Sequence, residues 1–256
     1  MISINQQKYI TSLHLKKFRQ KYRNFLVEGE KMVKELLTQQ RIAVVSIYGT
    51  ERWADQNAAL IQPFYDKFNT ITEVELKKIG TLTTPNQVLA IAEIPKEEVL
   101  NSIDPNLLTL YLDGIQDPGN MGTILRIADW FGIKTVCCSE DTVDAFSPKV
   151  VQSGMGACFR VGIMEGIMLS TLIKNHPDTS VIGAVMNGQN LFSAALSGNG
   201  ILVIGNEGKG IRSETENLLT HKITIPSGTK NGAESLNAGV ATGILVAELL
   251  RNKLVY

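Results

Sequence analysis

The 256-residue sequence predicts an α/β protein of two domains. Short apolar segments rich in β-branched residues alternate with longer segments whose apolar residues recur every three to four positions, as expected of strands alternating with helices. A charged segment bounded by prolines, at 96–106, separates a first block, 1–95, from a second block, 107–256. We expect each block to form its own domain, joined by this linker.

Composition excludes several classes of protein. Twenty-five Lys and Arg residues balance twenty-five Asp and Glu residues, so a uniformly basic nucleic-acid-binding surface is excluded, although a local basic patch is not. The three cysteines form no CxxC pair, and the three histidines show no ligand spacing with them, so we expect no metal site. The longest nearly apolar segment, 239–250, is too short to span a bilayer, and polar residues soon after Met1 leave no room for a signal peptide. We therefore expect a soluble cytoplasmic protein without a membrane partner.

The first block alternates strands with helices. Apolar and β-branched segments predict its strands, and apolar residues at helical spacing predict its longer helices. Thr72 and Glu75 have the spacing of a capping box, which begins a short helical turn. The expected elements, in order, are a strand at 24–28, a helix at 29–39, a strand at 42–48, a helix near 52–60, the turn from Thr72 and a strand at 86–94.

The strands of the second block are continuous apolar segments, which are typical of a parallel sheet covered on both faces. One helix is opened by Pro148 at its first turn, and an apolar helix ends the chain. The expected elements, in order, are a strand at 107–112, a helix at 121–131, a strand at 134–139, a helix at 147–154, strands at 181–186 and 201–205, a helix from Ser213 to near Leu219, a strand end at 223–226 and a helix from near Ser235 to Arg251.

Residues 1–27 contain basic residues and no acidic residue, with aromatic residues between the charges. Such a segment is either a solvated helix face or a surface that contacts phosphates. Its aromatic side chains suit either anchoring in a core or stacking on bases. The basic residues are Lys8, Lys16, Lys17, Arg19, Lys21 and Arg23.

Ligands of parallel α/β sheets bind at the loops that follow the strands, and three such loops in the second block carry unusual polar residues. In the first loop, 113–126, a Pro-Gly turn precedes Asn120, which we expect to cap the following helix. Arg126 lies nearly two turns along that helix. By themselves these features also fit a capped helix with a surface arginine.

The second loop, 205–210, contains three glycines, which allow backbone to approach a ligand closely. Its spacing matches neither the dinucleotide-binding GxGxxG pattern nor a phosphate-binding P-loop, and Glu207 would repel a pyrophosphate. A nucleotide- or dinucleotide-dependent enzyme is therefore disfavoured. A tight surface turn is the alternative for this loop alone.

The third loop, 225–237, leads into the last helix. Ser235 is a suitable N-cap residue for that helix. Asn237 adds a second polar side chain in the first turn of an otherwise apolar helix, and capping by Ser235 does not explain it.

Taken together and in this order, the three loops resemble the motifs of the SpoU-type (TrmH-like) RNA ribose 2′-O-methyltransferases of the SPOUT class. The resemblance covers residues 105–256 and extends more weakly to 23–29. One departure is a longer loop between Pro226 and Ser235, in which Ser227 stands where methionine is common. The matching residues are Asn120, Gly122 and Arg126, then Gly205, Glu207, Gly208 and Gly210, then Ile225, Pro226, Ser235, Leu236 and Asn237.

This resemblance implies a fold and a division of the chain. The expected fold is α/β, with a SPOUT-type parallel sheet whose C-terminal segment forms a deep trefoil knot, preceded by a smaller L30e-like α/β domain. True knots are rare among proteins, and the hydrophobic pattern alone does not predict one. Residues 1–95 would be an RNA substrate-binding domain, 96–106 a linker and 107–256 the SpoU methyltransferase domain.

The family's reaction is methyl transfer from S-adenosylmethionine to a ribose 2′-hydroxyl of RNA. An alcohol is a weak nucleophile near neutral pH, so the site has to orient it and help remove its proton. Because a guanidinium rarely gives up its proton, Arg126 would clamp the neighbouring phosphate or stabilise the forming alkoxide, and action as a base is the alternative. The implied catalytic residues are Arg126, Asn120, Glu207, Ser235 and Asn237; the implied cofactor-binding residues are Gly205, Ile225, Leu236, Met186 and Gly210; and the implied RNA-binding residues are Lys17, Arg19 and Arg23.

Members of the family are homodimers, so we expect a homodimer here, and the reaction needs no metal. The extra N-terminal domain favours ribosomal RNA, specifically 23S rRNA with a guanosine target, over transfer RNA, which is the alternative substrate. A catalytically inactive RNA-binding relative is a further alternative. It is disfavoured because all the motif residues are present.

Overall fold

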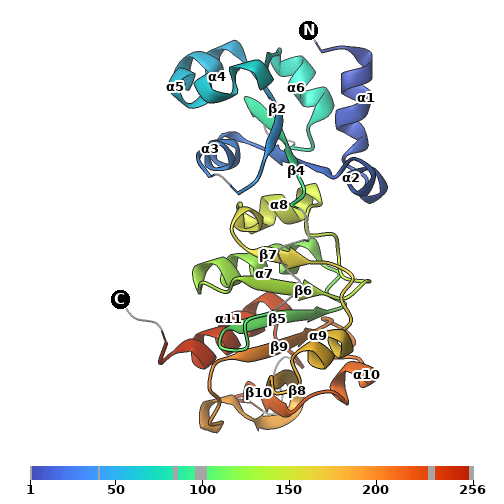
Figure 1. Ribbon diagram of the computed structural model, residues 1–256, viewed down its shortest axis with the longest axis vertical. Helices are drawn as coiled ribbons and strands as arrows, with labels where there is room; N and C mark the ends of the chain where they lie inside the picture. Colours follow the sequence, from blue (N-terminus) through green and yellow to red (C-terminus); the bar gives the residue numbers. More distant parts are fainter. Residues whose placement is uncertain (1, 40, 83–85, 96–102, 230–233, 254–256) are drawn as a thin grey trace. The chain divides into compact units, whose positions relative to one another are not determined.

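The computed structural model describes residues 2–39, 41–82, 86–95, 103–229 and 234–253. The chain divides by its contacts into two compact units. The first consists of Met1–Lys96 with Asp144–Phe159, and the second of Glu97–Val143 with Arg160–Tyr256. Among the described helices, none has both the length and the apolar character needed to cross a membrane. Each unit has its own sheet and helices (Figure 1).

The first unit is built on a four-stranded mixed sheet with the strand order β1-β4-β2-β3. Both β1 and β2 pair antiparallel with β4, and β3 pairs parallel with β2. The three longer strands lie at the predicted apolar segments, whereas β3 is a short edge strand that the pattern did not predict. The bounds are β1 (Asn24–Glu28), β2 (Val44–Gly49), β3 (Phe68–Thr70) and β4 (Val88–Glu93).

Helices cover this sheet and begin where local capping allows. The predicted capping box is present: Thr72 accepts from the backbone N–H of Glu75, and the Glu75 carboxylate accepts from that of Thr72. The expected helix at 52–60 is divided at Asn57 into two short helices. The helical elements of this unit are α1 (Ile4–Ser12), α2 (Lys16–Tyr22), α3 (Glu30–Thr38), α4 (Glu51–Gln56), α5 (Ala58–Ile61), η1 (Gln62–Lys67), α6 (Glu73–Ile79), α8 (Pro148–Gly154) and η3 (Ala157–Phe159).

The second unit contains a six-stranded sheet in which every pairing is parallel, in the order β10-β8-β9-β5-β6-β7. The parallel α/β sheet predicted from the continuous apolar segments is therefore confirmed. Its edge strand β7 is short, and the sequence pattern did not predict it. The bounds are β5 (Leu108–Asp113), β6 (Thr135–Cys138), β7 (Gly162–Met164), β8 (Val181–Asn190), β9 (Gly200–Gly205) and β10 (His221–Thr224).

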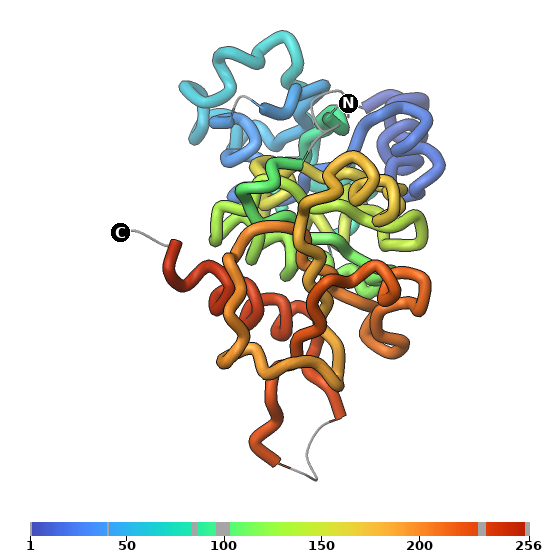
Figure 2. The backbone as a smooth tube through the Cα atoms, turned by 60° about the horizontal axis from the view of Figure 1, so that its bottom comes forward, coloured from blue at the N-terminus to red at the C-terminus, as the bar shows by residue number. Residues whose placement is uncertain are grey.

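Two long helices of this unit pack against each other, α7 (Pro118–Trp130) and α11 (Ala238–Leu250). The helix α11 also contacts β9 and η4 (Leu191–Ser193), and Figure 2 shows this red helix beside the orange segment that contains them. The helix expected from Ser213 to near Leu219 is only the short α10 (Ser213–Glu216). Its N-cap is Arg212 and not Ser213, so Ser213 and Glu216 do not form the predicted capping box. The remaining helix is α9 (Leu169–Asn175).

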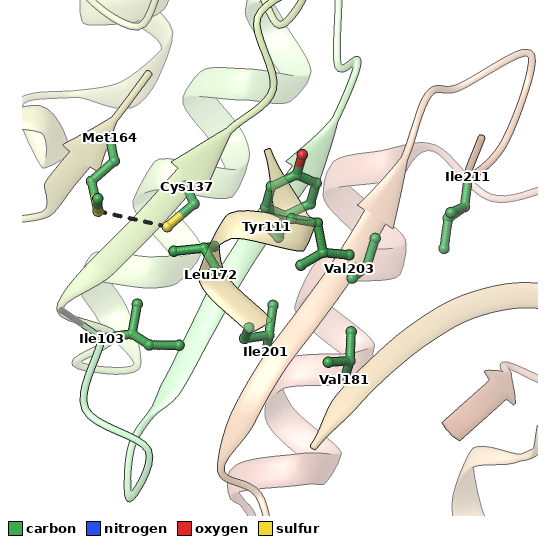
Figure 3. Packing of buried hydrophobic residues seen from close by; sticks show 10 residues of the cluster. Ile103, Tyr111, Cys137, Met164, Leu172, Val181, Ile201, Val203 and Ile211 are labelled. Carbon is green, nitrogen blue, oxygen red and sulfur yellow. Dashed lines mark hydrogen bonds between the residues drawn. The ribbon is translucent and has the colours of Figure 1, made fainter. Parts of the chain in front are cut away.

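One core of the second unit lies between the sheet and α9. Side chains of β5, β8 and β9 converge there, including Tyr111, Val181 and Val203 (Figure 3). The Tyr111 hydroxyl donates to the carbonyl oxygen of Ile167 at 2.9 Å, and burial raises its pKa to about 12. This core holds the centre of the sheet in place, because both faces of the central strands are buried.

A buried ion pair joins distant segments of the first unit. The side chain of Arg19 is 3% exposed; its Nε and Nη2 donate to Asp144 Oδ2 at 2.9 and 2.5 Å, and its Nη1 donates to the Leu13 carbonyl at 2.7 Å. Phe25 of β1 packs on Phe146 in the same region. The expectation that Arg19 contacts RNA is therefore wrong, because its guanidinium is buried and occupied by Asp144.

The substitution Asp144→Ala would leave this guanidinium buried without its carboxylate. We expect the free energy of unfolding to fall by about 3–5 kcal/mol. The measurement is urea unfolding followed by circular dichroism. A matched control is Lys34→Ala, which removes the exposed Lys34–Glu30 pair and should cost less than about 1 kcal/mol. Equal losses in the two variants would contradict the role of the buried pair.

Candidate active site

The candidate site lies at the carboxyl ends of β5 and β9. These two strands are neighbours in the sheet, and the last residues of each, Asp113 and Gly205, are paired. The chain continues from β5 through α7 to β6 on one side, whereas β8 lies on the other side of β9. The strand order thus reverses at this point, which is where parallel α/β sheets bind their ligands.

Three side chains from the three polar loops form a hydrogen-bonded network here. Asn120 Nδ2 donates to Glu207 Oε1 at 2.8 Å, and Asn237 Nδ2 donates to Asn120 Oδ1 at 2.6 Å. The carboxylate accepts only, so it fixes which end of the Asn120 amide faces it. The structure therefore brings together three of the five predicted catalytic residues.

Asn120 is not the N-cap of α7, contrary to the expectation from sequence. The helix begins earlier, at Pro118, and Asp117 is the cap: its Oδ1 accepts from the backbone N–H of Asn120 at 2.8 Å. Because Asp117 satisfies that backbone group, the Asn120 side chain is free to turn toward Glu207. Asp117 is a residue that sequence analysis missed, although an acidic residue directly before a proline is a recognisable helix start.

Ser235 is likewise not the N-cap of the last helix. The helix α11 begins at Ala238, and Asn237 is the cap, with Oδ1 accepting from the backbone N–H groups of Gly239 and Val240 at 2.9 and 3.2 Å. Asn237 therefore caps the helix and binds Asn120 with its two different amide atoms. Ser235 is exposed and makes no hydrogen bond to another residue of the described part. The centre of this third loop, 230–233, lies outside the described residues.

Arg126 is exposed on α7 and has no hydrogen-bond or ion-pair partner among the described residues. It lies six positions after Asn120 on the helix, and this offset turns its side chain by about 120° around the helix from the Asn120 direction. The structure therefore does not place Arg126 in contact with the network. Its guanidinium is left available to a ligand.

The glycine loop, 205–210, folds back on itself after β9. Asn206 and Gly210 exchange two backbone hydrogen bonds, of 3.0 and 2.9 Å. A Cβ atom at Gly205 would lie 2.4 Å from the backbone of Gly210, so only glycine fits there, and Gly210 has a positive φ of 70°. Two predicted cofactor-binding residues, Gly205 and Gly210, therefore lie together.

The other predicted cofactor-binding residues are less closely grouped. Leu236 and Met186 have exposed side chains, and Ile225 is partly buried just after β10. Exposed apolar side chains offer a surface for a flat apolar ligand group. Within the described ranges, no group of three His, Cys, Asp or Glu side chains is placed to hold a metal ion.

The predicted RNA-contacting residues other than Arg19 are exposed on or beside α2. Lys17 Nζ lies 5.0 Å from the centre of the Phe18 ring. Arg23 ends the helix with φ of 55° and donates from Nη2 to the Pro95 carbonyl at 2.8 Å. Tyr22 stacks on Phe18, with ring centres 6.2 Å apart, and Lys21 lies over the Tyr22 ring. Basic and aromatic side chains thus share this surface.

A cavity of about 790 Å³ lies in the first unit, where β2 and β3 end. Acidic and basic side chains both line it, so its charge does not favour one class of ligand. The hydrogen-bonded network of Asn120, Glu207 and Asn237 in the second unit is therefore a better candidate for the active site than this cavity. The charged side chains that line the cavity are Glu51, Arg52, Glu73, Glu75 and Lys78.

The chain is similar to known RNA methyltransferases over nearly its whole length. A 23S rRNA (guanosine(2553)-2′-O)-methyltransferase, RlmP of Bacillus subtilis, is 32% identical over 243 residues, covering 93% of this chain and 92% of that protein. A structure from Porphyromonas gingivalis, assigned to the TrmH family of RNA methyltransferases, is 39% identical with a TM-score of 0.84, covering 98% of this chain and 99% of that one. The SpoU methyltransferase AviRb of Streptomyces viridochromogenes, in complex with the cofactor AdoMet, has a TM-score of 0.85 at 20% identity, covers 98% of each chain, and supports the fold.

Family models match both units. Residues 5–90 match the MRM3-like substrate binding domain. Residues 107–247 match the SpoU rRNA Methylase family, and this segment is more than half of the chain. The chain, which has the polar network of three loops at the ends of β5 and β9, belongs to the SpoU rRNA methylase family.

Proposed function

We propose that this protein transfers a methyl group from S-adenosylmethionine (AdoMet) to a ribose 2′-hydroxyl of RNA, and that 23S rRNA is its substrate. The observation that carries the proposal is the hydrogen-bonded network of Asn120, Glu207 and Asn237, in a chain of the SpoU rRNA methylase family. The full-length similarity to RlmP, named for a guanosine of 23S rRNA, supports ribosomal RNA over transfer RNA.

The residues at the site fit AdoMet better than a phosphate-bearing cofactor. The glycines Gly208 and Gly210 leave the exposed loop backbone free of side chains, so a ligand can approach it closely, and Leu236 and Met186 offer apolar surface for an adenine ring. The Glu207 carboxylate would repel a phosphate but is compatible with a positively charged sulfonium. When bound, AdoMet supplies a methyl group that its positive sulfur already activates, so the proposed reaction needs no metal.

The protein's own residues have to position the ribose and stabilise its oxygen as the proton leaves. Arg126 carries a guanidinium with no partner in the described part of the chain, so it is available to the phosphate beside the target ribose or to the forming alkoxide. Asn120, held by Glu207, and Asn237, which donates to Asn120, offer oriented amide groups. We assign Ser235 to the same site because it lies two residues before Asn237 and is exposed.

We propose that the C-terminal segment is threaded into a trefoil knot and that the first unit has an L30e-like fold. Close backbone approaches support the threading: a Cβ at Gly188 would lie 2.4 Å from Ile223, and one at Gly198 would lie 2.1 Å from the carbonyl of Leu249. We assign 1–95 to RNA binding, 96–106 to the linker and 107–256 to methyl transfer, although 144–159 belongs by its contacts to the first unit.

We also propose that the protein is a cytoplasmic homodimer. The two packed helices α7 and α11 leave apolar side chains in solvent: Trp130 is 85% exposed, and Val240 is also exposed. Large apolar side chains in solvent can mark a protein–protein interface where they form one patch. A second copy of the chain would cover this face and bring its own α7, with Arg126, near the interface.

Methyl transfer is tested with labelled AdoMet and two substrates assayed separately, unmodified 23S rRNA and bulk tRNA. We expect label in 23S rRNA, at a linkage that resists alkali. Arg126→Ala should lower kcat/KM for RNA by roughly 10²–10³-fold, because a charge stabiliser is lost, while leaving AdoMet affinity unchanged. Arg251→Ala, which removes another exposed arginine of the same unit, is the control.

Each other result has a defined meaning. Label only in tRNA would contradict the rRNA assignment and leave the reaction class intact. Binding of AdoMet without transfer to either RNA would favour the inactive RNA-binding relative or a requirement for a ribosome-assembly intermediate. Absence of both binding and transfer would contradict the proposed function.

The surface of α2 is tested by the salt dependence of RNA binding. Lys17→Ala should weaken binding to 23S rRNA fragments and reduce the slope of log K against log salt by about one, because one phosphate contact is lost. Lys77→Ala removes an exposed lysine of α6 and should change neither quantity. The same slope in both variants would exclude Lys17 from the RNA interface.

The dimer is tested by light scattering. Trp130→Glu should convert a dimer into a monomer, because a carboxylate would be buried without a partner at the interface. Met168→Glu, at an exposed methionine before α9, is the control and should leave the mass unchanged. A wild-type monomer at micromolar concentration, or a dimer that survives Trp130→Glu, would contradict the assignment.

A further inference from the structure

One end of the segment that carries Glu207 is fixed to a buried carboxylate. Asp113, the last residue of β5, has no exposed side-chain surface. Its Oδ2 accepts from the backbone N–H of Arg212 at 2.9 Å, and its Oδ1 accepts from Arg212 Nε at 2.7 Å and also from Nη2. The carboxylate therefore holds both the backbone and the side chain of Arg212.

The other end of this segment, at Asn206, is fixed to Gly114, the residue that follows Asp113. Asn206 Nδ2 donates to the Gly114 carbonyl at 2.8 Å. Asn206 Oδ1 accepts from the backbone N–H groups of Gly208 and Lys209, both at 3.0 Å. Glu207 thus lies on a turn that is closed from within and tied at both ends to Asp113 and Gly114.

Further polar groups hold this anchor in place. The backbone N–H of Gly114 donates to Ser139 Oγ at 2.9 Å, and Ser139 Oγ donates to Asp141 Oδ1 at 2.7 Å. This hydrogen bond lowers the pKa of the Asp141 carboxyl. Arg212 Nη1 lies 3.4 Å from the same Asp141 oxygen, so its guanidinium lies between two carboxylates.

We propose that Asp113, Arg212 and Asn206 are positioning residues that hold the glycine loop in its AdoMet-binding shape and keep Glu207 against Asn120. This inference rests on the proposed function. A loop with three glycines loses more conformational entropy on ordering than most, so a free loop would bind its ligand less tightly. Tying both ends to the strand orders the loop before the ligand arrives. None of the three side chains needs to touch the reacting atoms.

The test combines hydrogen exchange of the loop amides with AdoMet binding by calorimetry, on the full chain without RNA. In Asp113→Asn and, separately, Arg212→Lys, exchange at Gly208, Lys209 and Gly210 should be roughly tenfold faster and the Kd for AdoMet roughly tenfold higher. Both substitutions nearly conserve volume. Arg160→Lys weakens another arginine–carboxylate pair of the same unit, with Asp129, and should change neither measurement.

A kinetic readout separates positioning from catalysis. The two variants should raise KM for AdoMet, and saturating AdoMet should restore most of kcat, whereas it should not restore kcat in Arg126→Ala. Unchanged loop exchange in both variants would overturn the inference, and so would faster exchange with unchanged AdoMet affinity. A wild-type chain that binds no AdoMet would contradict the proposed function instead. In that case the hydrogen exchange of the loop amides would still show whether Asp113 and Arg212 hold the loop in place.

Discussion

The parallel pairing of β5 with β9 determines where every part of the site lies. The register runs without a break from Leu108 opposite Gly200 to Asp113 opposite Gly205, so the two strands end level with each other. Loops that follow them must leave at the same edge of the sheet, which is why Asn120 and Glu207 meet although 87 residues separate them. A slip of one residue would reverse the side chains of a strand that is buried on both faces. The core around these strands thus fixes the register and, through it, the network.

The partner of each arginine decides what that arginine can do. Arg19 is buried against Asp144, Arg212 is held by Asp113, and Arg160 is paired with Asp129. A guanidinium paired in this way stabilises the fold and does not readily bind a phosphate, because a new anion would have to displace the carboxylate already bound to it. Arg126 has no such partner in the described part of the chain, although it lies on the same helix as Asn120 and one turn before Trp130. Its freedom suits the recognition of a phosphate that arrives with RNA.

The sequence predicted the longer strands and, among five expected catalytic residues, the three that form the network. It did not predict the short edge strands β3 and β7 or the groups that orient the network. Continuous apolar segments predicted the parallel strands because burial on both faces leaves that pattern. Asp117 and Asn120 are both suitable N-cap residues for α7, and Asn237 and Ser235 are both suitable for α11. The structure shows that Asp117 and Asn237 are the caps, which the sequence alone could not decide. Arg19 could not be assigned from local charge because Asp144 lies 125 residues away. A signal for Asp113 did exist: a carboxylate at the end of a strand that is buried throughout has to be paired or hydrogen-bonded.

Asn237 shows why helix capping and the site cannot vary independently in this chain. Its Oδ1 satisfies two backbone N–H groups at the start of α11, which leaves Nδ2 for Asn120. Aspartate would cap the helix equally well but has no donor, and its charge would face the Asn120 oxygen. Serine has a donor, but a hydroxyl bonded to the helix start does not extend to a second side chain. Asparagine alone among the common N-cap residues meets both demands. The position of α11, which packs on α7 and β9, is therefore coupled to the orientation of Asn120 by a single amide group.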